Sequence, residues 1–213
     1  MLDLFNDEAP WQEPLAPGAV ILRRRARDQG EALLAEIAAI AAQNPFQHLI
    51  TPGGYRMSVA MTNCGDLGWS SDARGYRYSE ADENSGREWP AMPTRFRQLA
   101  QEAAREAGFA SFNPDACLIN RYEPGAKLSL HQDKDEKDLQ QPIVSVSLGL
   151  PAVFQFGGLK RGDATQRILL EHGDVVVWGG PSRLRYHGIL PLKAGVHPLA
   201  GAYRYNLTFR RAR

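Results

Sequence analysis

The C-terminal half of the chain constrains the fold most strongly, because it is a series of short β-rich segments separated by turn residues. Seven such segments follow Asp115: residues 116–122, 143–150, 153–156, 167–170, 175–178, 184–187 and 203–209. Many short strands punctuated by Gly, Pro and Asp are typical of a β-sandwich, a jelly roll or a barrel. We therefore expect an all-β C-terminal half.

Two helices are predicted before these strands. Apolar residues recur at helical spacing over residues 29–43, where Asp28 and Glu31 form an expected capping box, and again over residues 94–107, which end at Gly108. Residues between these helices show no helical period, so we expect strands and long loops there. The helices would buttress one sheet.

Length and composition indicate one globular domain over residues 1–213, with an α+β fold that is mainly β. Hydrophobic residues make up 43% of the 213 residues and charged residues 23%, which is usual for folded proteins. No apolar stretch approaches the ~20 residues of a membrane span. The acidic N-terminus lacks the basic start and apolar core of a secretory signal, and the two cysteines form no CxxC motif. We therefore expect a cytoplasmic protein with no membrane partner.

The charge balance excludes a large phosphate-binding surface. The sequence has 25 Lys and Arg residues against 24 Asp and Glu residues, a net charge of +1, whereas extended nucleic-acid interfaces are usually strongly basic. Any contact with nucleic acid must therefore be local. The basic cluster between Arg23 and Arg27 is interpreted as solvated surface.

The tripeptide His131-Gln132-Asp133 is the sharpest local sign of a metal site. It follows a strand-like run, and residues i and i+2 of a strand project from the same face, so His131 and Asp133 would point together. A second such tripeptide, His172-Gly173-Asp174, lies between two β segments, where a turn is the better interpretation.

A third ligand would complete the 2-His-1-carboxylate arrangement of non-haem Fe(II) oxygenases. The remaining histidines are His48, His172, His187 and His197. Only His187 ends a predicted β segment. On this evidence a metal ligand and an ordinary strand histidine are equally good interpretations of His187.

The last predicted strand alternates strictly between aromatic or aliphatic residues and polar residues. Arg204, Asn206, Thr208 and Arg210 share its polar face. Two guanidinium groups would suit a small dicarboxylate, but an exposed edge strand with charged residues fits equally well. On the segment 116–122, Asn120 and Tyr122 share a face and could add neutral hydrogen bonds, although polar residues at the edge of the core are the better interpretation of this strand taken alone.

Taken together, these motifs resemble the AlkB-type Fe(II)/2-oxoglutarate-dependent dioxygenases. The resemblance rests on His131-x-Asp133, on His187, and on the Arg-x-Asn-x-x-x-Arg pattern of residues 204–210. It extends over nearly the whole chain through residues 51–55, 57–65, 115–122, 124–135 and 171–180. The HxD motif occurs in many oxygenases, whereas the Arg-x-Asn-x-x-x-Arg strand makes the resemblance specific to the AlkB-type enzymes.

The resemblance implies a double-stranded β-helix, or jelly roll, over about residues 115–213, with a nucleotide-recognition lid over about residues 45–90. It implies Fe(II) held by His131, Asp133 and His187, with 2-oxoglutarate and O2 as cosubstrates. The residues that it assigns to 2-oxoglutarate are Asn120, Tyr122, Arg204, Asn206, Thr208 and Arg210. Those that it assigns to the damaged base are Thr51, Met57, Met61, Trp69, Tyr76, Asp135 and Arg161.

The activity implied by the resemblance is oxidative dealkylation of 1-methyladenine and 3-methylcytosine in DNA, and also in RNA. The base would be presented in a single strand or flipped from a duplex. Such bases are cationic, so an aromatic face and a carboxylate would favour them. No obligate protein partner is implied. Two alternatives remain: an oxygenase of the same type acting on a protein side chain or small molecule, and a jelly-roll binding module without activity.

Overall fold

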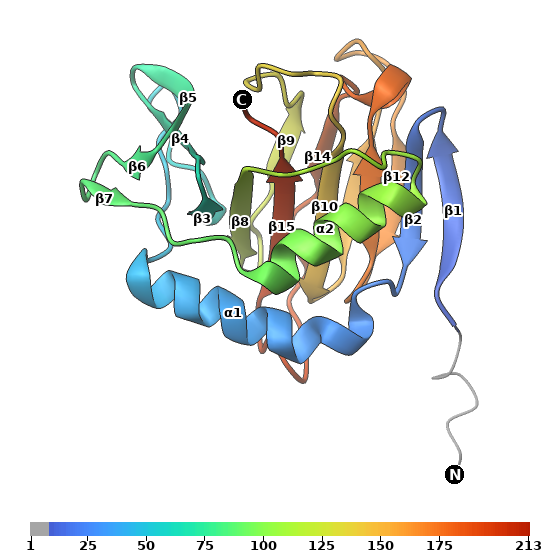
Figure 1. Cartoon of the computed structure of the whole chain (residues 1–213), viewed down its shortest axis with the longest axis horizontal. Helices are drawn as coiled ribbons and strands as arrows, with labels where there is room; N and C mark the ends of the chain where they lie inside the picture. Colours follow the sequence, from blue (N-terminus) through green and yellow to red (C-terminus); the bar gives the residue numbers. More distant parts are fainter. Residues whose placement is uncertain (1–8) are drawn as a thin grey trace.

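The computed structural model describes residues 9–213 and shows two facing antiparallel sheets (Figure 1). The strands of the larger sheet are β1 (Trp11–Ala16), β2 (Ala19–Arg23), β3 (Ala60–Gly65), β8 (Ala116–Tyr122), β10 (Ile143–Gly149), β13 (Val175–Trp178) and β15 (Arg204–Arg210). Their order is β1-β2-β13-β10-β15-β8-β3. The smaller sheet contains β9 (Leu128–His131), β11 (Ala152–Phe156), β12 (Gln166–Leu170) and β14 (His187–Ile189), in the order β12-β11-β14-β9.

Two helices cover one face of the larger sheet (Figure 1). They are α1 (Gly30–Gln43) and α2 (Thr94–Glu106). Their apolar faces pack on side chains from β8, β10, β13 and β15, and a second apolar cluster fills the space between the two sheets. This arrangement confirms the predicted jelly roll with buttressing helices. Among the described helices, none is long and apolar enough to cross a membrane.

The predicted capping box before α1 is wrong. A 3-10 turn, Arg27–Gln29, leads directly into the helix, and the residue at its N-cap is Gln29, which makes no capping bond. Asp28 lies in the middle of this 3-10 turn and not at the N-cap of α1, so its side chain does not cap the α-helix. The other helix matches the prediction, since Pro93 precedes it and Gly108, with φ of +93°, follows its end.

A small β segment stands at the β3 edge of the larger sheet, on the left in Figure 1. It consists of the hairpin β4 (Gly68–Asp72) and β5 (Gly75–Ser79) followed by β6 (Ala81–Asp82) and β7 (Arg87–Glu88). We call the β4–β5 pair the lid hairpin. Within the expected lid range of residues 45–90, β3 instead pairs with β8 as part of the larger sheet.

The N-terminal strands β1 and β2 are a feature that the sequence analysis missed. β2 pairs with β13, so the larger sheet also draws on residues before 115. The interpretation of Arg23 and Arg25 as solvated surface is also wrong. Arg23 bonds to Asp174 at 2.7 Å, and Arg25 bonds to Glu102 and Glu106 on α2. The acidic residues at positions 3, 7 and 8 lie outside the described residues.

The segment predicted as a strand over residues 184–187 is a strand only at its last residue: Leu184 lies in a turn, and residues 185 and 186 have no regular secondary structure. A short 3-10 helix, Gly180–Ser182, precedes it, and His187 begins β14 instead of ending a strand. The rejected motif around His172 is a turn, as expected, with Gly173 at φ of +90°. A side chain at Gly173 would come within 2.6 Å of the Arg27 backbone, so only glycine fits there.

Candidate active site

Two strands of the smaller sheet bring the predicted histidine ligands together. His131 on β9 and His187 on β14 are directly opposite in the ladder, and their ring centroids lie 4.4 Å apart. The register shifts at Gly188, where an added side chain would come within 2.6 Å of the Leu128 carbonyl oxygen. The missing side chain therefore allows the close strand approach that places the rings side by side.

Asp133 completes a three-residue cluster. Its Oδ1 lies 3.6 Å from His131 Nε2 and its Oδ2 lies 3.7 Å from His187 Nε2. Among residues 9–213, these three are the only His, Cys, Asp or Glu side chains grouped closely enough to share an ion, with ligand atoms within 4.8 Å of one another. Two imidazoles and one carboxylate that leave other positions open match the donor set of non-haem iron.

Backbone carbonyls orient both histidines. His131 Nδ1 lies 2.8 Å from the Ser129 carbonyl oxygen, and His187 Nδ1 lies 3.0 Å from that of Arg185. A proton on each Nδ1 can be donated to that carbonyl, which leaves the lone pair of Nε2 free to bind a metal. Such a hydrogen bond from the second ring nitrogen is usual for a metal-bound histidine. Burial and the neighbouring His131 lower the pKa of His187 to about 4, so its ring is neutral near pH 7.

The carboxylate of Asp133 is held ionised by its surroundings. Burial would raise its pKa, but Arg210, His187 and His131 outweigh burial and lower it below its usual value. Arg210 donates two hydrogen bonds to Asp133 Oδ2, from Nη2 at 2.9 Å and from Nε at 3.1 Å. The carboxylate is therefore charged and fixed in place before any metal binds.

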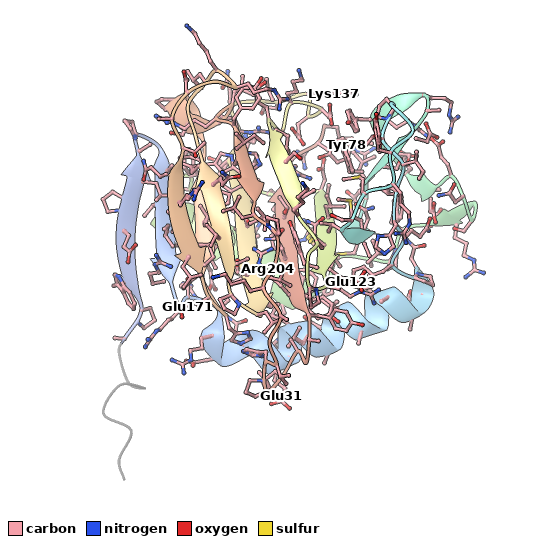
Figure 2. The ribbon with its side chains drawn as sticks, turned by 180° about the vertical axis from the view of Figure 1, so that it is seen from behind. Glu31, Tyr78, Glu123, Lys137, Glu171 and Arg204 are labelled. Carbon is pink, nitrogen blue, oxygen red and sulfur yellow. The ribbon has the colours of Figure 1, made fainter. Side chains whose placement is uncertain are left out.

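Arg204 is the clearest sign of an anion site. Its side chain lines the cavity and is only 1% exposed; Figure 2 labels it near the lower end of the strands. Nη2 donates to Ser147 Oγ at 3.0 Å, and the guanidinium lies over the Tyr122 ring at 4.8 Å, but Nε and Nη1 have no hydrogen-bond partner among the described residues. Burial lowers the pKa of Arg204. Two unpaired donors on a buried cation fit a carboxylate ligand.

The strand that carries both arginines is central in the larger sheet. β15 pairs with β10 on one side and β8 on the other, so the alternative of an exposed edge strand is wrong. Asn206 and Asn120 are cross-strand partners joined by a 3.2 Å side-chain bond, and Thr208 donates to Asn206 Oδ1 at 2.8 Å. The Asn120 side-chain oxygen has no partner among the described residues.

One cavity of about 580 Å³ joins these groups. All sixteen side chains predicted from the sequence line it: Thr51, Met57, Met61, Trp69, Tyr76, Asn120, Tyr122, His131, Asp133, Asp135, Arg161, His187, Arg204, Asn206, Thr208 and Arg210. A cavity of this size accommodates a small ligand or a single nucleotide.

The lid hairpin contributes an aromatic wall. Trp69 and Tyr76 stack with centroids 5.5 Å apart and planes inclined by 15°. Trp69 Nε1 donates to Asp135 Oδ2 at 2.8 Å, so the ring is fixed against the connection that follows β9. Arg161 also lines the cavity, donates to the Leu130 carbonyl oxygen at 2.7 Å and lies over the Tyr186 ring.

The sequence analysis missed three residues at or next to this cavity, of which Glu136 and Arg183 are buried and Tyr78 is partly buried. Arg183 and Glu136 form an ion pair at 2.9 Å, and Glu136 also accepts a hydrogen bond from Tyr78 of the lid hairpin. The acidic run after Asp133 was a signal for Glu136. No spacing or period in the sequence distinguishes Arg183 or Tyr78.

Comparison with known proteins gives the family. The model of the 2OG-Fe(II) oxygenase superfamily matches residues 18–210. The chain belongs to this superfamily. It is an Fe(II)- and 2-oxoglutarate-dependent dioxygenase that uses O2, and the donor set and the open Arg204 guanidinium both fit those groups.

Relatives of this oxygenase include two bacterial proteins named alpha-ketoglutarate-dependent dioxygenase AlkB. Those of Salmonella typhimurium and Escherichia coli are each 68% identical over 212 residues, covering 100% of this chain and 98% of the relative. The nucleic acid dioxygenase ALKBH1 of Mus musculus is 33% identical over 116 residues, covering 54% of this chain and 30% of the relative. A solved structure described as "The structure of OsALKBH1" superposes with a TM-score of 0.83 at 28% identity, covering 94% of this chain and 99% of that chain.

Proposed function

We propose that this oxygenase removes alkyl groups from N-alkylated bases, with 1-methyladenine and 3-methylcytosine in DNA as its main substrates and RNA as a further one. One observation carries this proposal: the stacked Trp69 and Tyr76 rings and the Asp135 carboxylate share a single cavity with the His-Asp-His cluster. The mouse relative is named a nucleic acid dioxygenase, which supports the substrate class.

In this proposal the metal is held by His131, Asp133 and His187. Arg204 and Arg210 hold the 2-oxoglutarate carboxylates, with Asn120, Tyr122, Asn206 and Thr208 as the neutral residues around them. When bound, iron, O2 and 2-oxoglutarate would together supply the oxidation: one oxygen atom of O2 places a hydroxyl group on the alkyl carbon, and the other enters succinate as 2-oxoglutarate loses CO2. The hydroxylated carbon then leaves as formaldehyde. No side-chain nucleophile is required.

The substrate side of the cavity favours a cationic planar group. Methylation at N1 of adenine or N3 of cytosine leaves a positive charge on the ring, so an aromatic face at Trp69 adds a cation–π interaction. The exposed Asp135 carboxylate adds a Coulomb attraction. Thr51, Met57, Met61 and Arg161 line the same cavity and complete the proposed contacts to the base.

A base inside a duplex cannot reach a cavity between two sheets, so the target nucleotide must be single-stranded or flipped out of the stack. One nucleotide needs few phosphate contacts, which agrees with a net charge of only +1. DNA as substrate and the two unbonded thiols, Cys64 and Cys117, support the cytoplasm as the compartment.

The test is turnover of a defined lesion. Purified protein is given Fe(II), 2-oxoglutarate, ascorbate, air and a single-stranded oligonucleotide with one 1-methyladenine or 3-methylcytosine. We expect mass spectrometry to show loss of one CH2 unit with matching formaldehyde and succinate, dependent on both iron and 2-oxoglutarate. Asp133→Ala should fold normally and abolish turnover.

The controls separate the alternatives. Succinate formation without loss of the methyl group would reject nucleic acid as the substrate and direct the search to protein side chains and small molecules. Equal activity of Asp133→Ala and the parent protein in the same iron-limited buffer would reject the ligand assignment.

A further inference from the structure

The connection that carries Asp133 is held by a side chain from another segment. β9 ends at His131, so no strand ladder fixes the backbone at Asp133. Arg183 fixes it instead: Nη1 donates to the Asp133 carbonyl oxygen at 2.5 Å, Nε donates to the Gln141 carbonyl oxygen at 2.9 Å, and Nη2 donates to Glu136 Oε2 at 2.9 Å. One guanidinium thus joins three points of the connection between β9 and β10.

Glu136 is the centre of this network. Its Oε2 accepts from Arg183, its Oε1 lies 3.5 Å from Arg210 Nε, and the same Oε1 accepts from the Tyr78 hydroxyl at 2.5 Å. The side chains of Glu136 and Arg183 are only 2% and 3% exposed. Figure 2 shows Tyr78 where the lid hairpin approaches the strands of the core.

The charges in this buried group balance. Asp133 and Glu136 carry two negative charges, and Arg183 and Arg210 carry two positive charges. Ion pairs link them in the order Arg183, Glu136, Arg210 and Asp133. If the charge of Glu136 were absent, two guanidinium groups would face one carboxylate. That excess positive charge would repel a divalent cation at Asp133, and water screens little in a buried site.

We propose that Glu136 is a positioning residue of the metal centre, which balances Arg183 and Arg210 so that Asp133 can hold a divalent cation. This inference rests on the metal ligands assigned under the proposed function. Glu136 would then affect metal affinity and 2-oxoglutarate affinity in opposite directions. Without its charge, Arg183 and Arg210 would repel the metal cation but attract the 2-oxoglutarate dianion.

The test is Glu136→Gln, which keeps the shape and the oxygen acceptor but removes the charge. Mn(II) serves as a redox-stable probe, with its affinity measured by calorimetry on the full chain, followed by the affinity of the Mn(II)-loaded protein for 2-oxoglutarate. We expect the Kd for Mn(II) to rise about 10–100-fold, the range typical of groups that support metal ligands. The Kd for 2-oxoglutarate should stay the same or fall. A packing defect would instead weaken both.

Three further variants sharpen the result. Glu106→Gln is the matched control, because Glu106 also pairs with an arginine but lies on α2, and it should leave Mn(II) affinity unchanged. Tyr78→Phe removes a hydrogen bond to Glu136 without changing its charge, so it should alter Mn(II) affinity by less than about threefold. Glu136→Asp keeps the charge but moves it back by one methylene, so its Mn(II) affinity should lie between that of the parent protein and that of Glu136→Gln.

Circular dichroism establishes that each variant is folded. If Glu136→Gln does not fold, Glu136→Asp decides, and unchanged Mn(II) affinity in it overturns the inference. So does unchanged Mn(II) affinity in a folded Glu136→Gln, or a parallel loss of Mn(II) and 2-oxoglutarate affinity. His131→Ala tests the assignment of the metal ligands separately from the role of Glu136. If this variant binds Mn(II) as tightly as the parent protein, the ligand assignment itself fails.

Discussion

Two arginines on one strand face show how the same residue type is used in opposite ways. Burial acts to lower the pKa of Arg210, but the two carboxylates with which it is paired, Asp133 and Glu136, raise it. Arg204 is equally buried but has two donors without partners, and burial lowers its pKa. Arg210 therefore stabilises the folded protein, whereas Arg204 lowers its stability until an anion binds.

Arg204→Met should make the ligand-free protein more stable. Methionine fills a similar volume and removes a buried cation with unsatisfied donors, so we expect the free energy of unfolding to rise by about 1–3 kcal/mol. Urea denaturation measures this change. In the same variant 2-oxoglutarate should no longer raise the melting temperature, whereas a saturating ligand stabilises the parent protein. A variant that is less stable than the parent without ligand would contradict the prediction.

Asp135→Asn should reduce the preference for charged bases. The asparagine oxygen can still accept the hydrogen bond from Trp69 Nε1, so the variant removes the charge and keeps the contact. We expect kcat/KM for an oligonucleotide with cationic 1-methyladenine to fall about five- to tenfold, corresponding to ~1 kcal/mol. The value for neutral 1-methylguanine should change by less than twofold. Equal losses for both lesions would show that the charge of Asp135 does not select the substrate.

At the scale of elements, the sequence predicts best where one periodicity covers a whole element. The polar face of β15 follows from strict alternation, but its central place in the sheet does not, because pairing partners are set by tertiary contacts. The segment 184–187 has β-rich residues, yet the Arg185 N–H donates to the Ser182 carbonyl oxygen, so a turn follows the 3-10 helix and the strand begins only at His187. β1 was missed because Pro14 and exposed polar residues weaken its strand pattern.

The candidate site shows a similar limit. The assignment of the sixteen predicted residues rests on the resemblance of their motifs to a known family, because the sequence pattern alone left both the arginine strand and His187 undecided. Glu136, Arg183 and Tyr78 form their network only when three distant segments meet. Neither alternation nor spacing encodes such a meeting, so these buried charges could be recognised only in the structure.

The lid hairpin should exchange its amide hydrogens faster than the core strands. It is a two-stranded sheet outside the two main sheets, and its side-chain links to the rest of the protein include Ser71 to the Ile50 carbonyl oxygen, Trp69 to Asp135 and Tyr78 to Glu136. Local opening is easiest where few such contacts exist. Hydrogen-exchange mass spectrometry should show slower exchange over residues 68–79 when a 1-methyladenine oligonucleotide binds, and a smaller effect with the unmethylated oligonucleotide. Identical protection of the hairpin in all three samples would refute a substrate-binding role.

At the scale of the whole molecule, the two sheets divide the work of the site. The smaller sheet supplies both histidines, the larger sheet supplies the arginine strand, and the lid hairpin supplies the aromatic wall. The helices pack on the outer face of the larger sheet and therefore fix it without entering the cavity. The site is thus completed only by folding of the entire described chain, so global stability and activity should be linked.

His172, which the cavity does not use, should make that stability depend on pH. Its Nδ1 accepts a hydrogen bond from the Gly149 N–H at 2.9 Å, its Nε2 has no partner among the described residues, and its ring stacks on His197. Burial, with His197 and Arg27, lowers its pKa to about 4, against ~6.5 in the unfolded chain. Between these values the unfolded chain binds a proton that the folded protein does not, so the contribution of His172 is complete above pH ~6.5 and is lost as the pH falls toward 4.

The variant His172→Asn isolates this effect, because asparagine can accept the same hydrogen bond but does not titrate. Urea unfolding of the metal-free protein at several pH values between 7 and 4.5 should show a shallower loss of stability in the variant than in the parent. The buried His187, whose pKa is also lowered to about 4, contributes equally to both proteins and so cancels in the comparison. Parallel curves would mean that His172 is protonated as readily in the folded protein as in the unfolded chain. A difference confined to this pH range would place a pH-sensitive contact far from the candidate active site, and stability would then decline in acid even where the cavity itself is unchanged.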